Sequence, residues 1–168
     1  MTSVPAGGSS NAAAHQVVTF RLGDDRFAAD IHAVERVLRF QEPTPVPNVA
    51  DWVDGVIEYQ GRVVPVINLR RRFGLDDAAP LGGTRIIVFS TPDGWVGVVV
   101  DAVLEVASVP AAQIAPPPPL FRGLSADYVR GIVRRNDRLA ILLDTARLLT
   151  ATERLVLAGA TEEDTTDA

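Results

Sequence analysis

One pattern of residues occurs twice in this chain, and it constrains the fold more than any other feature of the sequence. The first copy is the stretch Trp52 to Gly74, WVDGVIEYQGRVVPVINLRRRFG. In it, apolar residues lead into a tight turn at Gln60-Gly61, then into a β-branched run and a helical turn. The same order returns 76 positions later, from Tyr128 to Asp144. The chain therefore contains one structural unit twice.

The residues before these stretches repeat as well, at an offset of 69. Ile87 and Phe89 take the places of Val18 and Phe20, and a Pro-rich linker follows in both copies. Each unit reads as strand, turn, strand, strand, Pro linker, strand, tight turn, strand and helical turn. Five short strands are too few for two packed sheets but enough to close a small barrel. The sequence therefore predicts an all-β fold of two tandem five-stranded barrels.

This repeat also sets the predicted boundaries. We expect a flexible leader over residues 1–16, a body over 17–158 divided into subdomains at 17–80 and 81–158, and an acidic disordered tail over 159–168. Asp144 is a plausible N-cap for a C-terminal helix from Thr145 to Leu157. Pro65 would remove a hydrogen bond from the middle of a sheet, so its strand is expected at an edge or a bulge.

Composition excludes several classes of protein. The net charge is −5, and four of the acidic residues lie in the tail, so the body is nearly neutral and has no basic stripe for nucleic acid. There is no Cys and there are only two His, which leaves few ligands for a metal. No apolar run approaches the roughly 20 residues of a membrane span. We expect a cytoplasmic protein with no direct membrane insertion.

The sequence offers no converging set of catalytic residues. It has no phosphate loop and no nucleophile elbow. Its paired carboxylates, such as Asp24-Asp25 and Asp76-Asp77, lie in expected turns, where Asp bonds to local amides. We therefore expect no enzyme activity, no cofactor and no metal. The run Arg70-Arg71-Arg72 is either a docking site for an acidic partner or a solvated face.

From Val17 to about Leu157 the chain resembles the CheW-like coupling proteins of bacterial chemotaxis. The matching residues are the opening TFRLGDDRFAADIHAVERV, the linker TPVP, the block GRVVPVINLR, the block VGVVVDAV and the approach YVRG to LLD. The resemblance implies two SH3-like barrels. It also implies an adaptor that joins the regulatory domain of a CheA-type histidine kinase to the cytoplasmic tips of chemoreceptors, at membrane-associated arrays.

Matching the motifs position by position gives candidate partner contacts at Val34, Arg36, Gly55, Gln60 and Gly61, to which we add Arg70. Two positions depart from the family pattern, because Gln60 replaces a typical Arg and Arg36 replaces a frequent acidic residue. Arg36 with Glu58 is a possible substitute pair. The alternative to receptor coupling is a stand-alone module that binds another signalling or motility protein.

Overall fold

The computed structural model describes residues 14–117 and 128–147, and these residues form short strands joined by tight turns. The elements are β1 (Ala14–Leu22), β2 (Asp25–Asp30), η1 (Ile31–Ala33), β3 (Val34–Arg39), β4 (Val53–Tyr59), β5 (Arg62–Ile67), α2 (Leu69–Arg72), β6 (Arg85–Thr91), β7 (Gly94–Val100), β8 (Ala102–Pro110), η2 (Ala111–Gln113), β9 (Ile114–Ala115), β10 (Val129–Arg135), β11 (Arg138–Leu143) and η4 (Thr145–Arg147). The predicted all-β class is confirmed.

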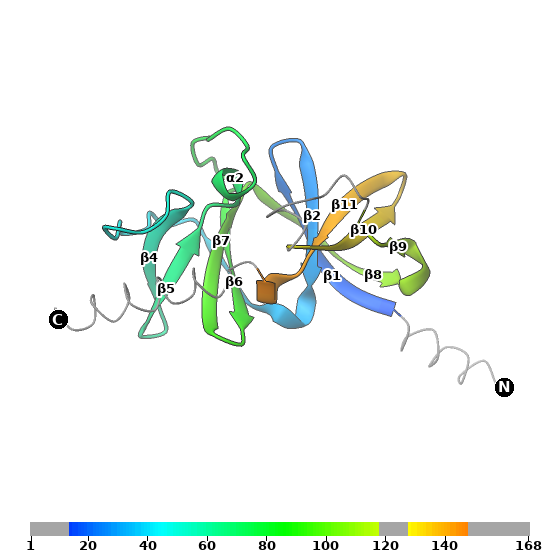
Figure 1. Ribbon diagram of the computed structural model, residues 1–168, viewed down its shortest axis with the longest axis horizontal. Helices are drawn as coiled ribbons and strands as arrows, with labels where there is room; N and C mark the ends of the chain where they lie inside the picture. Colours follow the sequence, from blue (N-terminus) through cyan, green and yellow to red (C-terminus); the bar gives the residue numbers. More distant parts are fainter. Residues whose placement is uncertain (1–13, 118–127, 148–168) are drawn as a thin grey trace.

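These strands form two sheets that lie side by side, with α2 above the place where they meet (Figure 1). One sheet has the order β8-β1-β2-β11-β10-β9 and is called barrel A here. The other has the order β3-β6-β7-β5-β4 and is called barrel B. Each sheet has one parallel pairing, β2 with β11 and β5 with β7, and the other pairings are antiparallel.

Each barrel takes its strands from both copies of the repeat. Barrel A combines β1 and β2 of the first copy with β8 to β11 of the second, and barrel B combines β6 and β7 of the second with β3 to β5 of the first. A single turn of 3-10 helix, η1, is the whole connection between β2 and β3, and it directs the chain from barrel A into barrel B. The predicted boundary at residue 80 therefore separates the two copies but not the two barrels, which is a correction to the expected subdomains.

The duplication extends to the irregularities of the strands. Register shifts occur between Val53 and Gly55 in β4 and between Val129 and Gly131 in β10, which are positions 76 apart. The parallel pair Val66 with Gly97 in barrel B corresponds in the same way to Leu142 with Ala28 in barrel A. Conserved shifts of this kind mean that the two barrels have one backbone design.

Both sheets close because the chain that leaves one edge strand returns to the opposite edge. In barrel A, β8 runs through the three residues of η2 into β9, which pairs with β10. In barrel B, the chain after β3 reaches Thr44, which forms an isolated bridge with Val56 of β4. Closure removes the free sheet edges that would otherwise invite aggregation.

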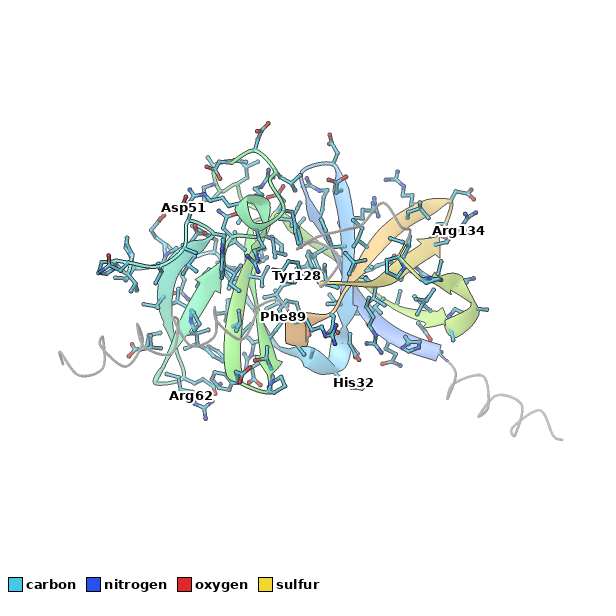
Figure 2. The ribbon with its side chains drawn as sticks, viewed as in Figure 1. His32, Asp51, Arg62, Phe89, Tyr128 and Arg134 are labelled. Atoms are coloured by element: carbon cyan, nitrogen blue, oxygen red, sulfur yellow. The ribbon has the colours of Figure 1, made fainter. Side chains whose placement is uncertain are left out.

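Buried residues form three clusters. One fills barrel A, around Val17, Val109 and Leu142, and one fills barrel B, around Tyr59, Val64 and Val88. The largest lies between the barrels and takes residues from both sheets. Its members are Val18, Phe20, Leu22, Phe27, Ala29, Val53, Ile67, Leu69, Ile87, Phe89, Val96, Val98, Val100, Tyr128 and Leu143. Phe89 and Tyr128 mark this cluster at the centre of the molecule in Figure 2.

Three expectations about the segments need correction or lie outside the described residues. Ala14 to Gln16 belong to β1, because β8 extends to Pro110 and supplies partners for them, so this end of the predicted leader is a strand. The predicted C-terminal helix begins only as the 3-10 turn η4, and the residues from 148 onward, including the tail, lie outside the described residues. The rest of the leader, residues 1–13, also lies outside them.

Of the two places predicted for Pro65, the edge strand is wrong, because β5 lies between β4 and β7. A bulge does lie next to it, since the register with β4 shifts between Val53 and Gly55, opposite Ile67 and Val66. Pro65 is opposite Val56, whose N–H and carbonyl bond to Thr44 at 2.9 and 2.8 Å instead of to β5. On its other side, the parallel pairing with β7 begins only at Val66. A proline fits this position because no partner strand requires its missing N–H.

Candidate docking surface

Four of the six predicted contact residues lie on or near the surface of barrel B. Gln60 and Gly61 form the turn between β4 and β5, with φ of 50° and 73°, as a type I′ turn requires. Arg36 is exposed on β3. Val34 is half-buried at the start of β3 and packs on the cluster between the barrels. The predicted tight turn at Gln60-Gly61 is therefore present.

Gly55 is buried and has a structural role. A Cβ at this position would lie 2.1 Å from the carbonyl oxygen of Thr44, and the residue has φ of +142°. Gly131 has the same place in barrel A, where a Cβ would lie 2.7 Å from the carbonyl oxygen of Ala115. Both glycines allow a close approach to the sheet by the segment that closes the barrel, which contains Thr44 in barrel B and Ala115 in barrel A and is called the closing segment here. Gly55 therefore lies beneath the docking surface, where it allows the barrel to close, and it is not exposed to a partner.

Arg70 is also engaged within the protein. Its guanidinium forms an ion pair with Asp101 and donates a hydrogen bond of 2.8 Å to the carbonyl of Asp76. Asp101 lies between β7 and β8, where the chain returns to barrel A, and it accepts a 2.7 Å hydrogen bond from the N–H of Gly23. Arg21 lies 3.7 Å from the same carboxylate. The contacts of the Asp101 carboxylate thus connect the two barrels. A partner could bind the Arg70 guanidinium only if its ion pair with Asp101 were broken.

Arg72 joins the two copies of the repeat at the same junction. Its guanidinium lies 4.3 Å from the ring centre of Trp52 and 4.6 Å from that of Tyr128, and it donates a hydrogen bond to the Tyr128 hydroxyl. Trp52 and Tyr128 are equivalent residues of the two copies. A cation between two aromatic faces is favourable where water is largely excluded. The sequence analysis did not predict this site. The feature that could have indicated it is the 76-residue offset, which makes the two aromatic residues equivalent positions of the repeat.

A charged group lies beside this junction, at the start of α2. Asn68 caps α2 by accepting the N–H of Arg71, and its amide donates to Asp54 at 3.4 Å. Burial raises the pKa of Asp54, and the Asn68 hydrogen bond and the Arg71 guanidinium partly offset the shift. Arg71 is exposed and pairs with Asp77 at 3.1 Å, a contact that raises the pKa of Arg71. The second arginine of the run thus also has partners within the chain.

Each barrel has a groove beside its hairpin, and three lining positions are equivalent in the two grooves. The groove on barrel A has a volume of about 880 Å³ and is lined by Ile132, Arg134 and Leu139 among others. The groove on barrel B is smaller, at about 230 Å³. The corresponding residues there are Val56, Glu58 and Val63. Leu139 is 58% exposed and Val63 38%, so each groove offers apolar surface to a partner.

Within residues 14–117 and 128–147, no group of three or more His, Cys, Asp or Glu is placed to hold a metal ion. No helix in this part of the chain is long and apolar enough to cross a membrane. The surface consists of exposed apolar side chains beside charged ones, an arrangement that suits binding of another protein.

Comparisons with known proteins agree with this description. A family model described as the CheW-like domain matches residues 16–153. The chain belongs to the CheW-like family. Similar proteins include the chemotaxis protein CheW of Klebsiella aerogenes, 32% identical over 82% of this chain and 83% of the relative, and protein FrzA of Myxococcus xanthus, 36% identical over 82% and 87%. The crystal structure of the scaffolding protein CheW from Thermoanaerobacter tengcongensis superposes with a TM-score of 0.73 at 30% identity, covering 77% of this chain and 88% of that one.

Membership of the CheW-like family confirms the resemblance and the double-barrel fold, and it makes this chain a chemotaxis scaffold, not an enzyme.

The substitute ion pair suggested between Arg36 and Glu58 is not found. Neither Arg36 nor Glu58 forms an ion pair with another of the described residues. In barrel A, Glu105, the counterpart of Arg36, lies 3.1 Å from Arg135, which is the neighbour of Arg134, the counterpart of Glu58. Arg36 therefore remains available to a partner.

Proposed function

We propose that this CheW-like protein couples the regulatory domain of a CheA-type histidine kinase to the cytoplasmic tips of chemoreceptors, acting in the cytoplasm at membrane-associated arrays. The observation that supports this proposal most is the match of the CheW-like domain over residues 16–153. A scaffold of this kind transmits a signal by binding its partners differently in their different states, without making or breaking bonds.

The proposed kinase contact lies on the exposed surface of barrel B. It contains Arg36 on β3, the Gln60-Gly61 turn, and the apolar residues Val37 and Val63, each 38% exposed. Apolar side chains bordered by charged ones are typical of a protein interface. Val34 supports β3 from the inner side, and Gly55 holds the closing segment in place. Arg70 contributes through the ion pair that fixes the two barrels relative to each other.

The test is calorimetric titration of the full chain with the regulatory domain of the histidine kinase encoded in the same genome. We expect Arg36→Glu to weaken binding by about tenfold, because a charge reversal in an interface opposes a like charge on a partner selected for the original one. Arg138→Glu is the matched control, since it makes the same change in net charge at an exposed residue of β11, on barrel A. Thermal unfolding of both variants shows whether the fold is retained.

Absence of binding by the wild-type chain to any cognate kinase domain would contradict the proposal. The departures from the family pattern at Arg36 and Gln60 favour one alternative in that case, a module that binds a different signalling or motility protein. Under that alternative, receptor-tip peptides and kinase domains both fail to bind, while Arg36→Glu still reduces binding to the true partner.

A further inference from the structure

The two barrels carry different kinds of side chain at equivalent positions beside their hairpin turns. In barrel B, the ring centres of Tyr59 and Trp95 lie 5.1 Å apart, and the guanidinium of Arg62 lies 4.3 Å from the centre of the Trp95 ring. Val64 and Val88 belong to the same buried cluster as Tyr59. Aromatic and apolar side chains therefore fill this part of barrel B.

In barrel A the same five positions surround a hollow. The counterparts of Tyr59, Trp95, Arg62, Val64 and Val88 are, in that order, Arg135, Arg26, Arg138, Ala140 and Thr19. All five line a cavity of about 130 Å³, together with Glu105, Asn136 and Leu139. We call this cavity the arginine pocket. Its side chains are smaller or more polar than the apolar ones at the equivalent positions of barrel B, and three of the five are arginines.

The arginine pocket has more positive than negative charge. Arg135 donates from Nε to the Glu105 carboxylate at 3.1 Å, which uses one of its five N–H donors. Neither Arg26 nor Arg138 forms a hydrogen bond or an ion pair with another of the residues that the structure describes. Three guanidinium groups and one carboxylate line the pocket, so two positive charges are in excess.

The fold holds these positive charges close together. Arg135 and Arg138 are directly opposite each other on β10 and β11. Like charges in a cross-strand pair destabilise a hairpin. Arg26 is half-buried on β2, the parallel neighbour of β11. The carboxylates of Asp25 and Asp137 line the larger groove beside the pocket but do not line the pocket itself. A bound anion would therefore offset a repulsion that the described residues leave in place.

We propose that the arginine pocket binds a phosphoryl dianion, carried by a free phosphorylated compound or by a phosphorylated side chain. A phosphoryl group has a charge of about −1.5 to −2 near pH 7 and three strong acceptor oxygens, which match the two excess charges and the guanidinium donors. A single carboxylate would offset only one of these charges. The inference goes beyond the proposed function, because it requires neither kinase nor receptor.

The test is titration of the ¹⁵N-labelled full chain with inorganic phosphate at constant ionic strength, followed by the amide shifts of β10 and β11. We expect the shifts to saturate with a Kd of about 1 mM or tighter. Acetate should bind at least about tenfold more weakly, because it carries one charge. Arg26→Gln and Arg138→Gln should each weaken phosphate binding by at least about tenfold, because each removes charge-assisted hydrogen bonds. Glu105→Gln should strengthen it by at least about threefold, because the substitution frees Arg135.

Matched controls on barrel B separate this site from an effect of net charge. Arg62→Gln removes one positive charge at the position equivalent to Arg138, and Glu58→Gln removes one negative charge at an exposed residue of β4. Both variants should bind phosphate as the wild type does. The amide spectra also show whether each variant is folded.

Free phosphoserine and a phosphoserine peptide, titrated in the same way, distinguish the two sources of the phosphoryl group. A peptide that binds more tightly than the free amino acid identifies a protein segment, and equal binding identifies a small phosphorylated compound. Shifts that do not saturate up to about 20 mM phosphate would overturn the inference. Binding by Arg26→Gln and Arg138→Gln equal to that of the wild type would do the same, as would controls that change binding as much as the pocket variants. None of these outcomes involves the kinase, so failure here is distinct from failure of the proposed function.

Discussion

The hairpins β4–β5 and β10–β11 have the same type of turn, the same bulge and the same parallel neighbour, yet their outer faces differ. Gln60 and Gly61 in one turn and Asn136 and Asp137 in the other all have positive φ. The strands beside them carry Glu58 in barrel B and Arg134 in barrel A. Positions that close the barrel or fill its core tolerate few residues, whereas exposed positions tolerate many. Comparing the copies therefore separates what the fold requires from what a partner selects.

The largest effect on stability should come from substituting the glycine that both barrels have beneath the closing segment. We expect Gly55→Ala to destabilise the protein by about 2–5 kcal/mol, because the new methyl group meets the backbone of Thr44 at a φ unfavourable for alanine. Gly131→Ala should cost less, since its contact with Ala115 is longer, 2.7 against 2.1 Å. Urea unfolding measures both values.

Gly61→Ala is the control for the glycine variants. Its Cβ would meet nothing within 4 Å, so only its positive φ opposes the substitution, at a cost of about 1–2 kcal/mol. If Gly55→Ala were no more damaging than Gly61→Ala, the closing contact would not be the reason for glycine at position 55, and a direct role in partner contact would become the better explanation.

A smaller effect should come from the site where the copies meet. We expect Arg72→Met to cost about 1–3 kcal/mol, because the cation between Trp52 and Tyr128 is lost from a largely buried place. Arg62→Met is the matched variant, since Arg62 lies at the same 4.3 Å from a single ring, that of Trp95, and is exposed. It should cost about 0.5–1 kcal/mol. Equal losses in urea unfolding would show that the second ring adds nothing.

The smallest effect should be the pH dependence of Asp54, whose counterpart in the other copy is Arg130. Burial raises the pKa of Asp54 in the folded state, so the folded protein holds this proton more tightly than the unfolded chain does. The contribution of Asp54 to stability therefore falls as pH rises from the unfolded value of 3.8 through the raised pKa. Asp54→Asn should lack this component and gain on the wild type as pH rises from 3.8 through the raised pKa of Asp54. Urea unfolding across that range checks the sign, and a difference that moves the other way would mean that the contacts with Asn68 and Arg71 outweigh burial.

Much of the fold could be predicted because the repeat preserves local chemistry. The β-branched runs give the strands, Gln60-Gly61 gives a turn with positive φ, and Asn68 gives the cap of α2. These features depend on residues near each other in the chain. The position of Pro65 could not be predicted, because the bond it lacks is made unnecessary by Thr44, a residue on another segment.

The candidate site stays a prediction, and the sequence showed only part of its geometry. Position-by-position matching proposed Arg36, Gln60 and Gly61, and the first is exposed on β3 while the other two form the turn between β4 and β5. Matching alone could not distinguish these from Gly55 and Arg70, which face inward to Thr44 and Asp101. A motif gives the identity of a residue, whereas exposure depends on which distant segment packs against it.

The sequence by itself determined that this protein has two copies of one β unit, that it belongs with the CheW-like proteins, and where its turns lie. Only the tertiary structure decided that the copies exchange strands, so that each barrel contains both. The reason is that strand order depends on pairings between residues far apart in the chain, such as Ile87 with Val37 and Val18 with Val106. A repeat can show that two units are alike, but it cannot show which strands of one unit pair with those of the other.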